Sequence, residues 1–271
     1  MEPTDIFIDS HTHFDLILEE SEETEETLLQ EMQSRTCLKA VQVAIDINNL
    51  AWSRDFALKN REKGILFTAG IHPSSPADEE ALLFLEKFIK DAQASNAGDL
   101  LFGIGECGLD FFRMRQPEKM QRASFSRQIN MAKSCDLPVI VHSRDAWKET
   151  MEILRDHKVE KGIMHCFPGD RDAAREALDL GFYLSFAGNV TFKKAVHLQE
   201  AAAFTPPERL LMETDAPFLT PVPHRGKANR PHFVAHTYQF IADLKNIPLE
   251  DLKKQVYDNF QNITTPQGEK Q

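Results

Sequence analysis

The chain has 271 residues, of which 42% are hydrophobic and 27% are charged. This is an ordinary globular composition, which excludes a disordered, collagen-like or coiled-coil protein, and the length allows one large domain or two small ones. The formal net charge of -11 argues, taken alone, against nucleic acid as a partner.

Sequence features that would indicate a membrane or secreted protein are missing. No apolar run reaches the roughly 18 residues that span a bilayer, and the first residues, MEPTDIFIDS, lack the positive start and long apolar stretch of a signal peptide. The scattered cysteines, without a CxxC pair, predict reduced thiols: Cys37, Cys107, Cys135 and Cys166. We therefore expect a cytoplasmic protein without a membrane anchor or an obligate protein partner.

Eight short apolar runs, rich in Val, Ile and Phe, predict eight strands. They cover residues 6–9, 40–45, 65–71, 101–106, 138–142, 162–165, 183–188 and 210–214. Several runs are continuous rather than alternating, which is typical of parallel strands buried on both faces.

Stretches with helical patterns lie between these runs. They cover residues 21–35, 49–61, 77–93, 117–134, 145–157, 170–180, 192–203, 232–245 and 249–260. In the clearest one, 77–93, apolar residues recur at helical spacing and Asp78 can cap the start. Pro117 lies near the first turn of its helix, and Gly181 closes another. The glutamate-rich run EESEETEE, residues 19–26, is interpreted as the solvated face of a helix.

This alternation predicts a (β/α)8 TIM barrel in a single domain, with a core at about residues 5–263. No linker rich in Pro, Gly or Ser divides the chain. An open doubly wound sheet has the same periodicity and is the alternative, so the positions of the polar residues must distinguish the two folds.

Six of the eight predicted strands finish in a His, Glu or Asp. The residues are His11, His13, His72, Glu106, His142, His165, Glu213 and Asp215. Active sites of barrels lie at the C-terminal ends of the strands, where a closed barrel brings all these ends together. An open sheet would keep the distant ends apart. The coincidence therefore favours both the barrel and a shared site.

The residue types in this set predict two divalent metal ions. The six proposed ligands are His11, His13, Glu106, His142, His165 and Asp215. The first two histidines are two residues apart, so on a strand they point to the same side. Glu106 can bridge two ions through its two oxygens, the later histidines can bind the second ion, and Asp215 can ligate the first ion and hold a water. Six ligands are too many for one tetrahedral ion, and two ions together can clamp a phosphoryl displacement.

Three further assignments concern chemistry around the ions. Asp215 is the predicted general base, because a bridging Glu106 has no free oxygen left for that task. Glu213 either binds metal or orients a ligand histidine. His72 is predicted to contact a substrate phosphate or to position a ligand. The donor set suits zinc, manganese, nickel or cobalt, and its carboxylates also admit magnesium.

Seven sequence runs occur in an order that resembles a known family. They are DSHTHFD, GIHP, GECGLDFF, PVIVHSRDA, MHCFPG, LLMETDAPFLTP and HRGKANRP. Together they resemble the TatD family of metal-dependent deoxyribonucleases in the amidohydrolase superfamily, over about residues 5–263. The resemblance implies a TIM barrel with two divalent metals that hydrolyses phosphodiester bonds in DNA. Both 3′ exonuclease and endonuclease activities are described for the family.

The resemblance also implies a division of the ligands and a role for His72. One metal would be bound by His11, His13, Glu106 and Asp215, and the other by Glu106, His142 and His165. His72 would contact a substrate phosphate. The chain departs from the family where tyrosines usually follow GLD, because it has Phe111 and Phe112 there. It has Arg230 where the family commonly has an acid.

A nuclease of acidic overall composition needs positive charge around the entrance to its active site, which we call the mouth. The loops after the strands supply candidate residues. The cations are Arg113, Arg115, Arg144, Arg225, Lys227 and Arg230, and the aromatic residues are Phe111, Phe112 and Phe167. Guanidinium groups suit phosphate oxygens, and exposed rings can stack on bases. In the alternative interpretation, the cations pair with surplus carboxylates and the rings pack against helices.

The leading hypothesis is therefore a metal-dependent phosphodiesterase that acts on DNA, on single strands or ends. The alternative is a hydrolase of the same fold that attacks a carboxylic ester or amide, such as an aminoacyl ester or a lactone. The phosphate-binding candidates favour the first hypothesis, and no lysine lies at a strand end where a lactonase-like carboxylated bridge would be expected. A binding module without activity is a third possibility, which an intact ligand set disfavours.

Overall fold

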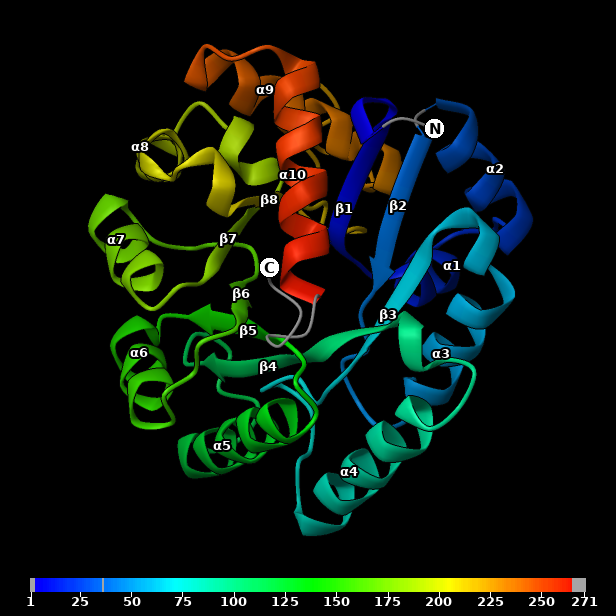
Figure 1. Ribbon diagram of the computed structural model, residues 1–271, viewed down its shortest axis with the longest axis vertical. Coiled ribbons are helices and arrows are strands. Elements are labelled where there is room, and N and C mark those ends of the chain that lie inside the picture. The colour runs from blue at the N-terminus through cyan, green and yellow to red at the C-terminus, as the bar shows by residue number, and fades with distance from the viewer. Residues whose placement is uncertain (1–2, 36, 265–271) are drawn as a thin grey trace.

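The computed structural model describes residues 3–35 and 37–264, and its eight strands form one parallel sheet in sequential order (Figure 1). The strands are β1 (Ile6–Thr12), β2 (Cys37–Gln42), β3 (Ile65–Ala69), β4 (Leu101–Asp110), β5 (Val139–Arg144), β6 (Gly162–Met164), β7 (Tyr183–Phe186) and β8 (Leu210–Met212). Every predicted strand is confirmed, and so is the single-domain (β/α)8 barrel. The open doubly wound sheet is excluded.

Helices surround this sheet and follow the predicted alternation (Figure 1). They are α1 (Phe14–Glu20), α2 (Glu25–Arg35), α3 (Leu50–Lys59), α4 (Glu79–Gln93), α5 (Glu118–Ser134), α6 (Trp147–Asp156), α7 (Arg171–Asp179), α8 (Val196–Phe204), α9 (Val234–Lys245) and α10 (Leu249–Thr264). Asp78 caps α4 as predicted, because its carboxylate accepts a hydrogen bond from Ala81 N at 2.9 Å. Gly181 follows α7 with φ of 85°, a left-handed conformation that glycine adopts without strain.

The glutamate run at 19–26 does not lie on one helix, so that prediction was wrong. Helix α1 ends at Glu20 and α2 begins at Glu25, and the run spans the break between them. Phe14 and the apolar residues after it form a short helix directly after β1, with Phe14 fully buried. Thr24 then starts α2, since its hydroxyl accepts a hydrogen bond from Thr27 N at 3.2 Å.

Side chains close the seam between β1 and β8, where an isolated bridge joins Thr12 of β1 to Ala216, which follows β8. The buried Asp9 carboxylate accepts hydrogen bonds from Thr214 N at 2.9 Å and from Thr214 Oγ1 at 2.6 Å. Beyond it, Asp215 N donates to His11 O at 2.9 Å. These contacts fix the segment after β8 against β1, which places Asp215 beside the first two histidines.

Further along the same seam, a tyrosine hydroxyl forms hydrogen bonds with the backbone of β1, as a neighbouring strand would. Tyr238 of α9 is fully buried, and its hydroxyl donates to Ile8 O and accepts from Ile8 N, both at 3.1 Å. Helix α10 packs against β1 and β8 as well, and its Phe260 stacks on Phe102 of β4 with ring centroids 4.7 Å apart.

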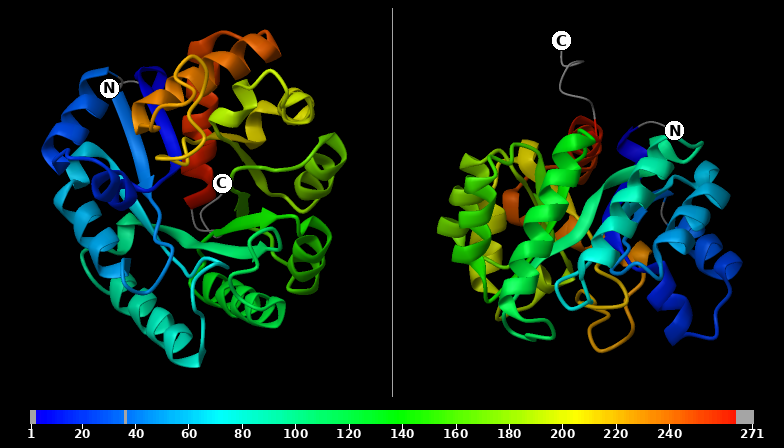
Figure 2. Two further views of the ribbon diagram at one scale, coloured as in Figure 1. Left: turned by 180° about the vertical axis from the view of Figure 1, so that it is seen from behind. Right: turned by 90° about the horizontal axis from the view of Figure 1, so that it is seen from below.

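The loops that follow the strands project from the end of the barrel opposite the C-terminus (Figure 2, right). The short helix α1 and the loop after β8 extend from this same end. Cys107, Cys135 and Cys166 are free thiols, as predicted, and the side chain of Cys37 lies outside the described residues. Within residues 3–35 and 37–264, no helix is both long and apolar enough to cross a membrane.

Candidate metal centre

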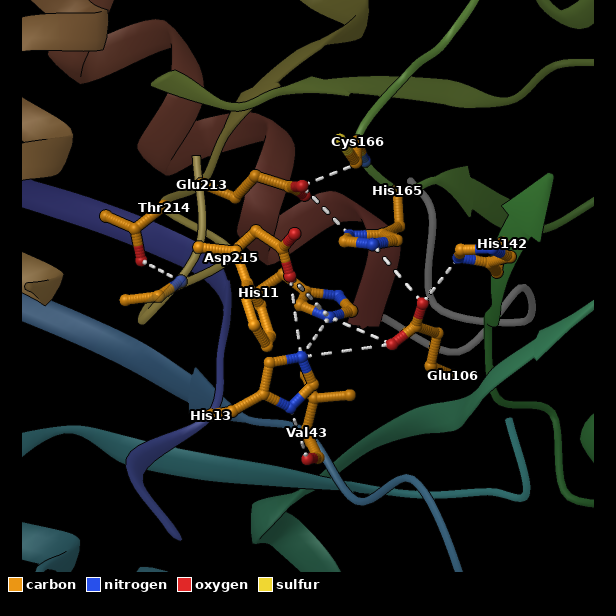
Figure 3. A network of polar contacts seen from close by, with 12 residues as sticks. His11, His13, Val43, Glu106, His142, His165, Cys166, Glu213, Thr214 and Asp215 are labelled. Atoms are coloured by element: carbon orange, nitrogen blue, oxygen red, sulfur yellow. Dashed lines mark hydrogen bonds and ion pairs between the residues drawn. The ribbon is translucent and has the colours of Figure 1, made fainter. Parts of the chain in front are cut away.

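The strand ends bring the predicted ligands together around a single carboxylate (Figure 3). The residues that meet there are His11, His13, His72, Glu106, His142, His165 and Asp215. They come from β1, β4 and β5 and from the segments after β1, β3, β6 and β8. The side chain of Glu106 is only 5% exposed and lies between two groups of imidazole nitrogens.

The first donor group surrounds one oxygen of that carboxylate. His11 Nε2 lies 3.3 Å from His13 Nε2 and 3.3 Å from Glu106 Oε2. Asp215 Oδ1 lies 3.4 Å from His13 Nε2 and 3.9 Å from His11 Nε2. A tetrahedral ion with bonds of 2.0–2.1 Å separates its donor atoms by about 3.3 Å. The spacing of these four donors therefore fits a bound metal ion.

The second donor group surrounds the other oxygen, Glu106 Oε1. His142 Nδ1 lies 2.7 Å from it, His165 Nε2 3.3 Å and His72 Nε2 3.4 Å. The two oxygens of Glu106 thus face different sets of nitrogens, which is the arrangement that a bridging carboxylate requires. His72 was predicted to contact a substrate phosphate or to position a ligand, and the structure places its Nε2 in one group with Glu106 and His142.

The charges of the first group also suit a divalent cation. Burial lowers the pKa of His11 to about 3, so this imidazole is neutral at pH 7 and free to ligate. Burial also acts to lower the pKa of His13, but the hydrogen bond and charge of Asp215 and the charge of Glu106 raise it to about 9. The two carboxylates thus favour a positive charge close by, and a metal ion between these donors would supply it.

Two of the ligand histidines have an acceptor near their other ring nitrogen, as is usual for metal sites. His13 Nδ1 lies 3.1 Å from Val43 O (Figure 3). His165 Nδ1 lies 2.9 Å from Glu213 Oε1, which also accepts a hydrogen bond from Cys166 N at 2.8 Å. The fully buried Glu213 thus contacts His165, as an orienting partner would, and it also forms a possible ligand group with His11 and His165.

Asp215 differs from Glu106 in its exposure. Its side chain is 15% exposed, so solvent reaches a carboxylate that also faces the first donor group. Its φ of 54° lies in the left-handed region, which costs about 1–3 kcal/mol for a residue other than glycine and is common in functional sites. The hydrogen bond from Asp215 N to His11 O holds this conformation.

Two acidic residues near the ligands were not selected from the sequence. Asp110 Oδ2 lies 3.5 Å from His142 Nε2, and the charge and hydrogen bond of this imidazole lower the pKa of Asp110 to about 2, against the effect of burial. Asp9 joins Thr214 to β1. The signal for Asp9 was available, because it precedes His11 by two residues and so points to the same side of β1.

The predicted cations differ in what they contact. Arg113, Arg225 and Lys227 are exposed and Arg144 is partly buried. The Arg144 guanidinium lies over the Phe112 ring at 4.0 Å, and that of Arg225 lies over the Phe192 ring at 4.2 Å. Within residues 3–35 and 37–264, none of the four cations forms an ion pair with a carboxylate, so their charges stay available to an anion.

Two predicted contacts at the mouth were wrong. Arg230 NH2 lies 2.7 Å from Glu23 Oε1, so its charge is used within the protein, to tie the loop after β8 to the α1–α2 connection. Phe167 is buried and packs edge-on against Trp147, which leaves no face for a base.

The remaining candidates at the mouth differ in their exposure. Phe112 is 61% exposed, as base stacking requires, and Phe111 is partly buried against the core. Arg115 is exposed.

Comparisons with known proteins agree with this geometry. The profile of the family described as "TatD related DNase" matches residues 8–265. An Escherichia coli K12 protein named "Uncharacterized metal-dependent hydrolase YcfH" is 36% identical over 259 residues, 94% of each chain. The Bacillus subtilis protein named "Uncharacterized metal-dependent hydrolase YabD" is 34% identical over 264 residues, 95% of this chain and 98% of that protein.

Solved structures show the same architecture. The structure of YJJV, a TatD homologue from Escherichia coli K12, has a TM-score of 0.84 at 27% identity and covers 95% of this chain and 97% of that chain. A TatD family hydrolase from Entamoeba histolytica has a TM-score of 0.82 at 20% identity, covering 96% and 98%. The barrel, its donor groups and these relatives define a metal-dependent hydrolase. Within that class, the chain belongs to the TatD-related DNase family.

Proposed function

We propose that this hydrolase cleaves phosphodiester bonds in DNA, on single strands or ends, with two divalent cations bound on either side of Glu106. The observation that carries the proposal is the position of this carboxylate, with Oε2 facing the first donor group and Oε1 facing the second. The cations would be bound by His11, His13, Glu106, His142, His165 and Asp215. When bound, such ions would polarise phosphoryl oxygens and lower the pKa of a bound water molecule.

Asp215 is the residue of this chain that we propose as general base. Its carboxylate is partly exposed, whereas Glu106 is buried with both oxygens engaged. Asp215 can therefore orient a water molecule and take its proton as the water attacks phosphorus. Glu106 acts by holding the two donor groups at a fixed separation.

The cations that form no ion pair are our candidates for contacts with the phosphates of the substrate. Arg144 lies at the end of β5, close enough to the site for its charge to lower the pKa of Asp110. Arg113, Arg225 and Lys227 extend from the loops after β4 and β8. We assign flanking phosphates to these four side chains, since cations at the mouth grip the backbone of a nucleic acid without reading its sequence. The ring of Phe112, under Arg144, offers a face to an exposed base.

His72 receives a second role in this proposal. Burial lowers its pKa to about 3, so it is a neutral imidazole at pH 7. Its Nδ1 accepts a hydrogen bond from Ser74 N at 3.0 Å, which leaves the proton on Nε2, directed at Glu106. From that position, the N–H group can donate to a non-bridging oxygen of the scissile phosphate.

The direct test compares substrates under one set of conditions. Metal-free protein is supplied with Mg, Mn, Zn, Ni or Co, and turnover is measured on single-stranded DNA, RNA and a panel of carboxylic esters, amides and lactones. We expect DNA to have the highest kcat/KM, with less than 1% of the rate for Asp215→Asn, a loss of about a hundredfold or more. Preferential hydrolysis of an ester, amide or lactone would instead identify the alternative function.

A further inference from the structure

Two histidines outside the metal centre face each other through the same ring atom. His224 lies in the loop after β8, and His236 lies in the first turn of α9. Their Nε2 atoms are 3.1 Å apart, and both residues are partly buried. Neither belongs to the donor groups around Glu106, and the mechanism proposed above uses neither of them.

The geometry of this pair is close to that of His11 and His13 in the metal centre. There, the two Nε2 atoms are 3.3 Å apart and the ring centroids 5.0 Å apart, at an angle of 77°. For His224 and His236, the corresponding values are 3.1 Å, 4.9 Å and 56°. Bonds of about 2.0–2.1 Å to one ion separate two donors by about 3.3 Å in a tetrahedral and about 2.9 Å in a square or octahedral arrangement. The pair therefore fits two ligands of one ion.

Packing and backbone hydrogen bonds hold the His224 ring in this orientation. It lies parallel to Phe233, with ring centroids 4.2 Å apart and an angle of 3° between the rings. In the backbone, His224 N donates to Pro221 O at 2.8 Å, and Lys227 N donates to His224 O at 3.1 Å. An imidazole that is already in place loses less freedom when it binds an ion.

Histidines are concentrated in this part of the chain. Of the ten in the sequence, three lie within residues 224–236, and the third is His232. Its ring packs edge-on against Phe233, and both of its ring nitrogens are buried without a hydrogen-bond partner. Within residues 3–35 and 37–264, the three histidines do not gather closely enough to bind one ion together. We therefore assign only His224 and His236 as ligands.

The donor set selects the class of ion. Neutral imidazole nitrogens suit zinc, nickel and copper, whereas magnesium, calcium and manganese prefer oxygen donors. Among the described residues, no carboxylate or thiol completes a group of three donors around the pair, so water would fill the remaining positions. Arg225 and Lys227 repel a cation, but both are exposed, where salt screens the repulsion.

We infer that His224 and His236 bind a divalent transition-metal ion of the zinc, nickel or copper class, and that this ion joins the loop after β8 to α9. The inference goes beyond the proposed function and does not depend on it. The loop extends from the end of the barrel (Figure 2, right), and residues 225–228 are exposed. An ion bound by the residue directly before this stretch would reduce the opening of the loop.

Metal binding is measured on the full chain with Ni²⁺ as the probe, at pH 8, where ordinary imidazoles are neutral. Calorimetric titration at micromolar protein counts the bound ions, and anomalous scattering from crystals locates them. We expect a peak between His224 and His236, separate from any at the metal centre. His236→Gln should lack this peak and bind one Ni²⁺ fewer. The control His197→Gln changes an exposed histidine of α8 and should bind as the original chain does.

Limited digestion with trypsin measures the effect of the ion on the loop. Trypsin cleaves after lysine and arginine, and Arg225 and Lys227 are exposed in the loop. An ion that binds only the closed loop reduces the open population by the factor 1 + [Ni²⁺]/Kd, so ten times the Kd should slow this cleavage about tenfold. His236→Gln should be cleaved at one rate with and without Ni²⁺, whereas His197→Gln should be protected.

Several results would overturn the inference. The first is the absence of a peak between the two rings, or equal numbers of ions bound in solution by the original chain and by His236→Gln. Protection that persists in His236→Gln would place the ion elsewhere, and cleavage of the original chain at one rate with and without Ni²⁺ would remove the link between loop and helix. None of these results depends on DNA hydrolysis, so the proposed function stands or falls separately.

Discussion

The conservative variant Asp215→Asn separates proton transfer from metal binding. In the structure, Asp215 Oδ1 lies 3.4 Å from His13 Nε2, within the first donor group. An asparagine keeps an oxygen at this position and keeps the backbone contact with His11, but it has no charge and cannot take a proton. We therefore expect the metal to remain bound and the base to be lost.

The expected loss follows from the role of a single proton acceptor. General base catalysis contributes about 10²–10⁴ to a rate, so kcat on DNA should fall by that factor. The assay combines steady-state kinetics with metal content measured on the same preparation. Asp172→Asn, an exposed carboxylate of α7, is the control and should keep full activity.

Two results would refute this account of Asp215. Near-native turnover of the variant would show that another group takes the proton. Loss of metal in proportion to the loss of rate would show that this carboxylate serves only as a ligand.

Three further variants test the surroundings of the site. Glu213→Gln should weaken metal binding by about 10–100-fold in a calorimetric titration, because it removes the charged acceptor on His165 Nδ1; unchanged affinity would contradict the orienting role. Tyr238→Phe should lower the free energy of unfolding in urea by about 1–3 kcal/mol, since two buried backbone groups of β1 lose their partner. The control Tyr257→Phe should have little effect, and equal stability of the two variants would contradict the role of Tyr238 at the seam between β1 and β8. Arg225→Ala should flatten the slope of log affinity for DNA against log salt by about one unit at unchanged kcat, and a fall in kcat alone would place this side chain in the chemistry.

The features that the sequence predicted well are those with a local signal. The eight strands appear as apolar runs, and the ligands appear as polar residues directly at their ends. The spacing of His11 and His13 predicts their arrangement, because side chains two residues apart on an extended chain point to the same side. The closed barrel then requires these ends to meet, so the sequence predicted the ligand cluster before any distance was known.

The features that the sequence did not predict depend on partners far along the chain. Glu23 meets Arg230, and Tyr238 meets Ile8, across the barrel seam. Neither contact produces a periodic pattern in the sequence from which it could be predicted. Phe167 shows the same limit, because its burial depends on Trp147 of the preceding helix and on the next strand. The break in the glutamate run was missed because glutamate favours helix on both sides of it.

Anomalous scattering from crystals of the metal-loaded protein tests the central claim most directly. We predict two ions in each chain, one beside His11 and His13 and the other beside His142 and His165, with Glu106 between them. A single ion, with His142 and His165 directed away from it, would contradict the bridging carboxylate and the mechanism built on it.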